Sequence, residues 1–114
     1  MDKKNTYFVD IDGTIFVYRK FESYETSDAQ VIKSTKQYLQ NAKDKGHMII
    51  LTTARPEGLR DHTLFELRKA NIPFDRLIMG IERGPRYLLN DMDPNNPGDR
   101  AICYNLERNG GIKS

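Results

Sequence analysis

The stretch Tyr7-Phe8-Val9-Asp10-Ile11-Asp12-Gly13-Thr14 places two carboxylates two residues apart at the end of an apolar run. Side chains at i and i+2 of a strand point to the same face, so Asp10 and Asp12 should project together from the end of a strand. At about 5–6 Å they would repel by about 3 kcal/mol at an effective dielectric near 20. A cation between them, or one protonated acid, would relieve that repulsion. The stretch therefore indicates a metal-assisted site at the carboxyl end of a strand.

A structural alternative applies to the same residues. Asp-x-Asp-Gly is also a common turn, because Asp and Gly both suit loops and Asp caps helices. Short motifs often occur by chance. The choice between a turn and a site therefore depends on the rest of the chain.

Size and composition favour one folded domain. The chain has 114 residues, of which 38% are hydrophobic and 30% charged, with a net charge of +2. No apolar run reaches the roughly 20 residues that span a bilayer, and Met1-Asp2-Lys3-Lys4-Asn5 leads into a strand rather than a signal peptide. A cytoplasmic location is expected, since the single cysteine, Cys103, excludes an internal disulfide and is expected to be a buried structural thiol. No membrane or nucleic-acid partner is required.

The apolar pattern predicts strands that alternate with helices. We expect a strand ending at Asp12, a hairpin flap over 15–26, a helix after Ser27-Asp28 and a second helix from Pro56-Glu57-Gly58 to Asn71. Further strands are expected at 48–51, 77–80, 87–90 and 101–104. This order predicts an α/β fold with a parallel sheet of about five strands and flanking helices. The whole of 1–114 is expected to form one domain with a mobile tail over 108–114.

Polar side chains follow three of these strands: Asp10 and Asp12, then Thr52, then the run Asn90-Asp91-Met92-Asp93. In a parallel sheet they would gather on one edge. In this order and spacing, 9–14, 49–52 and 88–93 resemble the first, second and fourth motifs of the haloacid-dehalogenase superfamily of phosphatases and phosphotransferases. The resemblance covers roughly residues 5 to 107 and implies a Rossmann-like domain.

The resemblance also implies roles. Asp10 would be the nucleophile that forms an aspartyl-phosphate, and Asp12 the acid and base. Asp10, Asp12 through its backbone carbonyl, and Asp91 would hold Mg²⁺. Thr52 would bind a phosphate oxygen, and backbone N–H groups at Gly13 and Thr14 would cradle the rest.

The third motif departs from the family pattern, because no lysine lies between Lys69 and Lys113. Arg83 and Arg86 are therefore the candidates for its cation, with a slight preference for Arg86, although either could be a surface charge. Arg55 is expected at the mouth of the site as a contact to the substrate phosphate or the leaving group, with a capping or surface role as the alternative.

Two further polar residues have open roles. Thr53 is a candidate substrate contact or a strand-end cap. Asp93 is a candidate second acidic ligand or a residue that orients the ligands. The segment 104–108 has no assigned role.

The intervals between the motifs leave no room for a cap domain, so the chain resembles capless members of the superfamily. It also resembles small bacterial proteins associated with capsule or polysaccharide synthesis, which implies a sugar phosphate as substrate. A homo-oligomer is a further hypothesis, since a small open site gains from burial by a neighbouring subunit. The predicted function is Mg²⁺-dependent hydrolysis of a phosphomonoester; the alternatives are phosphotransfer through the same aspartate, or a catalytically weak binding module.

Overall fold

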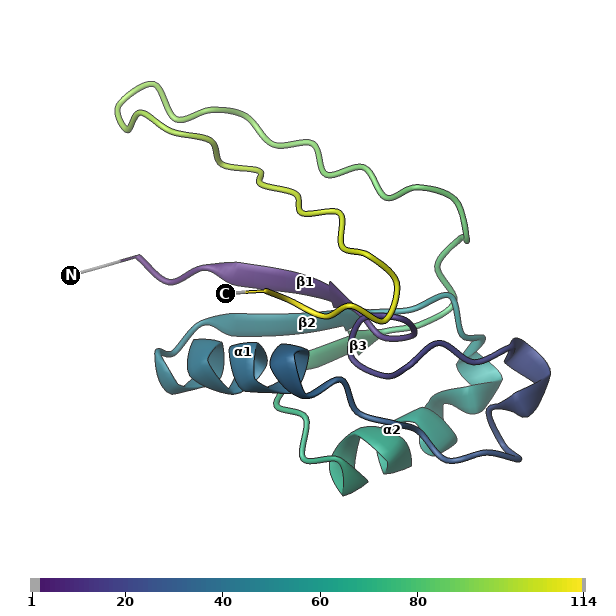
Figure 1. Cartoon of the computed structure of the whole chain (residues 1–114). Helices are drawn as coiled ribbons and strands as arrows, with labels where there is room; N and C mark the ends of the chain where they lie inside the picture. The colour runs from purple at the N-terminus through teal and green to yellow at the C-terminus, as the bar shows by residue number, and fades with distance from the viewer. Residues whose placement is uncertain (1–2, 114) are drawn as a thin grey trace.

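The computed structural model describes residues 3–113 and contains a small parallel sheet with two helices (Figure 1). Met1, Asp2 and Ser114, which the expected domain 1–114 includes, lie outside the described residues. The elements are β1 (Thr6–Asp10), η1 (Phe21–Ser23), α1 (Lys33–Asp44), β2 (Met48–Thr52), η2 (Glu57–Leu59), α2 (Arg60–Lys69) and β3 (Arg76–Ile78). The α/β class and the single parallel-stranded domain are as predicted. Neither α1 nor α2, the helices of residues 3–113, has the length and apolar character needed to cross a membrane.

The sheet has the order β1-β2-β3 with both pairs parallel. Asp10 is in register with Thr52, and Thr52 with Ile78, so the three strands end at one edge. β1 is an outer strand, and within residues 3–113 its edge away from β2 pairs with no other strand. The predicted site residues at the ends of β1 and β2 are therefore neighbours.

The two faces of the sheet differ in burial. Val9, Ile49 and Leu51 are buried, and they share one core cluster with Leu39 of α1 and Leu67 of α2. Both helices therefore cover the same face. The opposite face carries Phe8, Met48 and Ile78, which are 53%, 39% and 44% exposed. In this structure one face of the sheet is packed and the other is largely open.

The helix boundaries agree only partly with the sequence signals. α1 begins at Lys33, after Ile32, rather than at Ser27-Asp28, because Ile15 and Phe16 first pair with the chain before the helix: Ile32 N donates to Ile15 O, and Phe16 forms a bridge with Val31. Gly46, with a φ of +84°, follows α1 as the C-terminal signal predicts.

The expected strands at 87–90 and 101–104 are not present. Residues 84–106, here called the arm, form an extended excursion without strand or helix, and it projects from the body past β1 (Figure 1). The sheet of residues 3–113 accordingly has three strands rather than about five. The apolar runs resemble strands, but within residues 3–113 they remain largely exposed. Cys103 is exposed for the same reason, which corrects the expectation of a buried thiol.

The flap and the tail also differ from expectation. Residues 15–26 contain the one-turn helix η1 and no strand pair, so no hairpin forms there. The expected mobile tail is held at Asn109, whose backbone N donates to Gly13 O over 2.7 Å and whose Oδ1 accepts from Tyr18 N over 2.7 Å. The end of the chain therefore packs against the loop that follows β1.

Candidate active site

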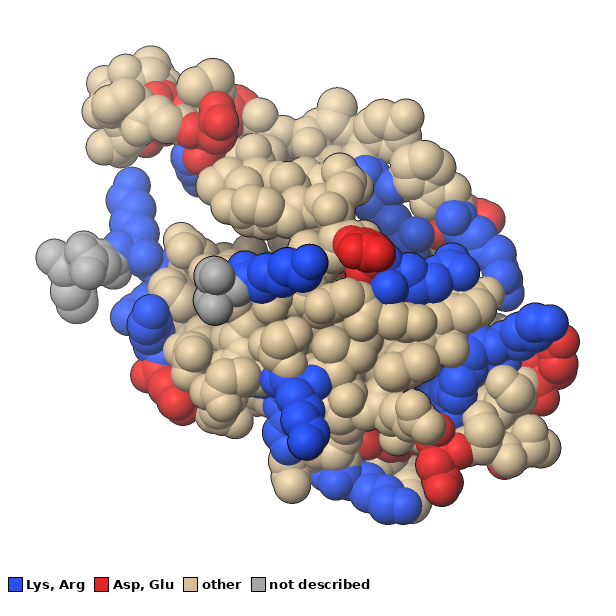
Figure 2. Space-filling model, in the orientation of Figure 1, with Lys and Arg blue, Asp and Glu red and all other residues tan. Residues whose placement is uncertain are grey.

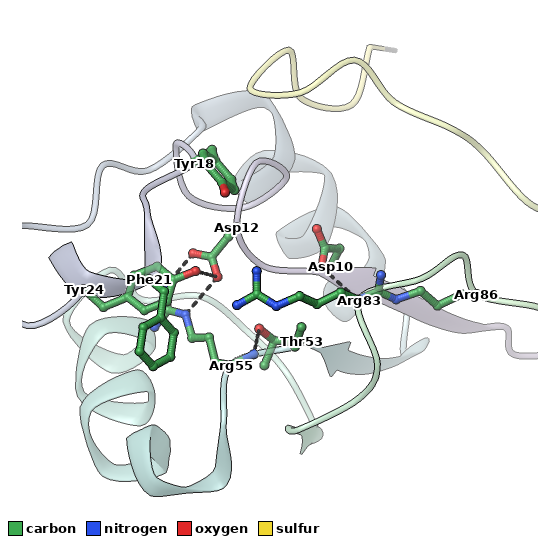
Figure 3. Close-up of a pocket in the computed structure, with 10 residues that line it drawn as sticks. Asp10, Asp12, Tyr18, Phe21, Tyr24, Thr53, Arg55, Arg83 and Arg86 are labelled. Atoms are coloured by element: carbon green, nitrogen blue, oxygen red, sulfur yellow. Dashed lines mark hydrogen bonds and ion pairs between the residues drawn. The ribbon is translucent and has the colours of Figure 1, made fainter.

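Asp10 lies at the carboxyl end of β1 and faces a pocket (Figure 3). Its side chain is 45% exposed, Arg86 Nη2 lies 3.8 Å from Oδ1, and Thr14 Oγ1 donates to Oδ2 over 3.4 Å. Burial raises the pKa of Asp10 above its ordinary value, while the charge of Arg86 acts in the opposite direction. Asp10 is thus an accessible carboxylate beside a cation, as a nucleophile toward an anionic group requires.

Asp12 is held much more firmly than Asp10. Arg55 donates from Nε to Oδ2 over 2.9 Å and from Nη2 to Oδ1 over 2.8 Å, and the Tyr24 hydroxyl donates to Oδ2 over 3.1 Å. Such a two-point pair fixes the plane of the carboxylate. Oδ2 thus accepts two hydrogen bonds and Oδ1 accepts one, so Oδ1 keeps capacity for one further partner.

A buried charge network supports Asp12 from behind. Arg55 Nη1 donates to Glu66 Oε1 over 2.9 Å, and Arg19 Nη2 donates to the same oxygen over 2.9 Å. Burial opposes ionisation of Glu66, but the hydrogen bonds from the two arginines prevail and lower its pKa. Four charged side chains, two of each sign, therefore balance one another beneath the pocket: Asp12, Arg19, Arg55 and Glu66.

Arg55 is buried beneath the pocket, whereas the sequence placed it at the mouth of the site. Its side chain is fully buried, and its guanidinium stacks on the Tyr24 ring at 4.2 Å from the centroid. Its N–H groups are used by Asp12, Glu66 and Thr63 rather than left at the mouth of the site. The structure indicates a positioning residue for Asp12 more than a direct phosphate contact.

Glu66 and Tyr24 are the residues of this network that the sequence reasoning missed in these roles. Glu66 lies on the buried side of α2 together with Thr63 and Leu67. A charged residue at the helical spacing of buried residues was therefore the sequence signal that could have revealed this role. Tyr24 was considered only as a flap aromatic. Burial and then the Asp12 charge raise the pKa of Tyr24 to about 12, so its hydroxyl remains a donor to Asp12 at ordinary pH.

The loop after β1 uses its backbone donors internally. Gly13 N donates to Phe16 O over 2.7 Å, and Thr14 N donates to Ile11 O over 3.2 Å. Gly13 has a φ of +89°, a conformation that favours glycine. The N–H groups at Gly13 and Thr14, expected to cradle phosphate, are engaged within this turn. The side chain of Thr14 is the group that reaches Asp10.

The two threonines at the end of β2 are arranged differently. Thr52 stands in register with Asp10 and is half-buried. Thr53 is buried; its Oγ1 accepts from Arg55 N over 3.1 Å, and its backbone N donates to Ile78 O over 3.0 Å. Thr53 thus closes the strand end, the alternative that the sequence left open, and it also lines the pocket.

The pocket gathers most of the predicted residues. Its lining includes the following side chains: Asp10, Asp12, Thr53, Arg55, Arg83, Arg86, Tyr18, Phe21 and Tyr24. In Figure 3 Arg83 extends into the space between Asp12 and Asp10, while Arg86 approaches Asp10. Lysines and arginines are also spread over the face seen in Figure 2. The pocket is therefore lined by arginines, with two carboxylates at its base and aromatic rings at its rim. The positive charge of the arginines suits the pocket to an anionic ligand.

Asp91 is not part of this pocket. It lies exposed on the arm, where the side-chain amide of Asn90 donates to it over 3.3 Å. Asp93 closes the turn of the arm by accepting from Asn95 N and from the Asn96 amide, both over 2.9 Å. Within residues 3–113 no three His, Cys, Asp or Glu side chains come close enough to hold a metal. The Mg²⁺ site expected from Asp10, Asp12 and Asp91 is therefore not assembled within one chain.

A family model for haloacid dehalogenase-like hydrolases matches residues 7–71, more than half of the chain. The chain belongs to the haloacid dehalogenase-like hydrolases. The match includes most of β1 together with β2, α1 and α2, and it ends before the arm. The family resemblance of the first two motifs is confirmed, whereas the resemblance of 88–93 to a fourth motif stays a prediction.

Solved structures share the fold of this haloacid dehalogenase-like chain. Two structures of a Pnkp1/Rnl/Hen1 complex, one described as an RNA repair complex, match with a TM-score of 0.61 and 24% identity. The match covers 74% and 73% of this chain and 30% and 27% of those chains, so this chain spans less than a third of their length. A structural-genomics target from Vibrio cholerae matches with a TM-score of 0.54 and 16% identity, over 80% of this chain and 85% of that one. No curated protein matches.

Proposed function

We propose that this hydrolase cleaves phosphomonoesters and that Asp10 is its nucleophile. The observation that carries the proposal is the pair of Asp10 and Arg86 across the pocket, with 3.8 Å between Arg86 Nη2 and Asp10 Oδ1. An arginine so placed offsets the repulsion between an anionic nucleophile and an anionic phosphoryl group. Attack by Asp10 on phosphorus would form an aspartyl-phosphate and expel the leaving oxygen, and water would then release phosphate. We also propose that the reaction requires Mg²⁺, which would offset the negative charge of the phosphoryl group as Asp10 approaches it.

The other pocket residues take supporting roles in this proposal. Asp12 serves the leaving oxygen and the attacking water, and Arg55 and Tyr24 orient it. Arg83 and Arg86 bind the phosphoryl oxygens, and Thr52 stands beside Asp10 as a further hydrogen-bond donor. A hydrolase and a phosphotransferase would share these groups up to the aspartyl-phosphate. Access of water then decides between the two reactions.

Two substrate classes merit a first test. A sugar phosphate follows from the sequence resemblance to proteins of polysaccharide synthesis. A nucleotide is supported by Tyr18 and Phe21, which are 38% and 48% exposed at the pocket rim, because exposed aromatic rings stack on bases.

The test is phosphate release from sugar phosphates, nucleotides and 3′- or 5′-phosphorylated oligonucleotides, with Mg²⁺ and with a chelator. Asp10→Asn should lower release at least about a thousandfold, as loss of a nucleophile does elsewhere. Asp61→Asn, on an exposed position of α2, removes the same charge outside the pocket and should retain activity. If the folded wild-type protein releases no phosphate from the whole panel, the phosphatase proposal fails and a binding module is favoured.

A further inference from the structure

The polar groups at the base of the pocket are largely engaged with one another. Arg55 donates two hydrogen bonds to Asp12, and the Tyr24 hydroxyl donates a third. In the proposed function the other charged groups of the lining serve the phosphoryl group. The part of the lining that remains for the rest of a substrate is therefore mainly aromatic, and it consists of the rings of Tyr18 and Phe21.

The size of the pocket limits what can enter it. Its volume is about 110 Å³, whereas pockets that enclose a whole small organic ligand measure about 300–1,000 Å³. A phosphoryl group fits into such a space, but a complete phosphomonoester does not. The leaving group therefore lies at the rim, where Tyr18 and Phe21 are 38% and 48% exposed.

Each of the two rim rings is held by a neighbour inside the protein. Arg108 Cζ lies 3.9 Å from the centroid of the Tyr18 ring, and Tyr18 N donates to Asn109 Oδ1 over 2.7 Å. Phe21 packs edge-on against the buried ring of Tyr24, with 6.0 Å between the centroids. Rings that are fixed before a ligand arrives lose little conformational entropy on binding. The rim thus presents rigid aromatic surfaces to the leaving group.

This rim suits a flat ring better than a hydroxyl-rich group. Sugar hydroxyls are recognised by hydrogen-bond acceptors such as carboxylate and amide oxygens. Among residues 3–113 the pocket lining contains no amide side chain, and its only carboxylates are Asp10 and Asp12, which serve the reaction in the proposed function. An aromatic face, by contrast, stacks on any nucleobase because every base has a π-face. The lining therefore favours a ligand that carries a base.

The Tyr18 ring lies apart from the cations of the pocket. In Figure 3 it stands above Asp12, on the side of the pocket away from Arg86. A Cβ at Gly13 would lie 3.3 Å from Arg108 Cγ, so the Arg108 side chain crosses the loop after Asp12 before it stacks on Tyr18. A ligand with its phosphoryl group at Arg86 needs a spacer to reach this ring. The ribose of a nucleotide provides such a spacer.

We infer that the substrate of this pocket is a nucleoside monophosphate, whose phosphoryl group lies beside Asp10 and Arg86 and whose base stacks on the Tyr18 ring. The inference rests on the proposed function in treating the pocket as a phosphomonoester site, and it chooses between the two substrate classes named there. Tyr18 is then the residue that determines specificity, and Arg108 is the positioning residue that holds its ring.

The first test compares ligands that differ by the base. Ribose 5-phosphate is 5′-AMP without adenine, and 3′-AMP carries the phosphate at the other position. Dissociation constants are measured by isothermal titration calorimetry with Mg²⁺ on Asp10→Asn, so that turnover does not interfere. At least one of the two nucleotides should bind about tenfold more tightly than ribose 5-phosphate, as one stacked base contributes. Similar constants for all three ligands, or no binding of either nucleotide, would overturn the inference.

The second test changes Tyr18 in the same Asp10→Asn background. Tyr18→Leu removes the ring and should abolish the preference for the nucleotide, while the dissociation constant of ribose 5-phosphate stays within about twofold. Tyr18→Phe keeps the ring and should keep the preference. Tyr104→Leu, at an 80% exposed position outside the pocket lining, is the matched control and should change neither constant. If Tyr18→Leu weakens both ligands equally, or if Tyr18→Phe loses the preference, base stacking on Tyr18 is wrong.

The role of Arg108 is tested by kinetics in the chain with Asp10 intact. Arg108→Lys keeps the positive charge and loses the planar group that stacks on Tyr18. The KM for the preferred nucleotide should rise about threefold with kcat unchanged, because only binding of the base is weakened. The KM for ribose 5-phosphate should not change. An equal rise for both substrates would make Arg108 a charge contact and contradict its positioning role.

These readouts separate the inference from the proposed function. Tighter binding of a nucleotide than of ribose 5-phosphate, without phosphate release from any substrate, supports the nucleotide site and contradicts the phosphatase. Phosphate release with equal kcat/KM for the nucleotides and ribose 5-phosphate does the reverse.

Discussion

Two aspartates of one motif have different environments, and the difference follows from their neighbours rather than from their spacing. Asp10 is about half exposed and has a single cation at 3.8 Å, whereas Asp12 is 11% exposed and bound at two points by a buried arginine. Asp10 can therefore meet a ligand directly. Asp12 is held in place by three hydrogen bonds, so its position is set before any ligand arrives.

The pH dependence of stability should reveal the environment of Asp10. Its pKa is raised in the folded protein above the ordinary 3.8, so folding favours the protonated form. Its contribution to stability is then fully present below pH 3.8 and is lost as pH rises through the folded-state pKa. Asp10→Asn should accordingly gain stability relative to wild type between pH 4 and pH 7, measured by urea denaturation at each pH. Asp61→Asn controls for the loss of one charge, and an equal effect in both variants would contradict the prediction.

Arg55→Met should be among the most damaging single changes. It leaves Asp12 and Glu66, whose side chains are 11% and 9% exposed, without their shared cation. Breaking a buried pair in this way costs about 3–5 kcal/mol. The free energy of unfolding from urea titration measures the loss, with Arg60→Met, at an exposed pair with Glu57, as the control. A loss below about 1 kcal/mol would show that the network adds little to stability.

At the scale of elements, the loop after β1 is closed by the far end of the chain rather than by a hairpin. Asn109 donates its backbone N–H to Gly13 and accepts from Tyr18, and Arg108 stacks on the Tyr18 ring at 3.9 Å from its centroid. Residues 90 to 96 positions apart in sequence therefore shape one wall of the pocket. The pocket depends on this closure because Tyr18 is part of its rim.

Asn109→Gly tests this closure. Asn109 has a φ of +65°, which glycine also adopts, so the change keeps the backbone and removes only the acceptor for Tyr18 N. The loss should be about 1 kcal/mol, seen as faster hydrogen exchange at the Tyr18 amide. Asn71→Gly, after α2 with a φ of +55°, is the matched control and should leave that amide unchanged. An unchanged Tyr18 amide in Asn109→Gly would show that the side chain does not hold the loop.

At the scale of the molecule, a small body carries a long arm. The principal extents are 51, 29 and 25 Å, so the chain is elongated along one axis. The core lies on one face of a three-stranded sheet, and the arm adds nothing to it. A core of this size gives limited stability to a single copy.

The sequence by itself determined the parallel α/β fold, the two helices and the position of Asp10 and Asp12 at a strand end. These depend on local periodicity and on the glycine and proline signals near Gly46 and Pro56, which act over a few residues. Only the tertiary structure decided that Glu66 of α2 is buried and that the Arg55 side chain points inward and pairs with Asp12. It also decided that the apolar runs 87–90 and 101–104 lie outside the sheet. A run of apolar residues shows that a segment is suited to burial, but only the packing of the whole fold determines whether the segment is buried.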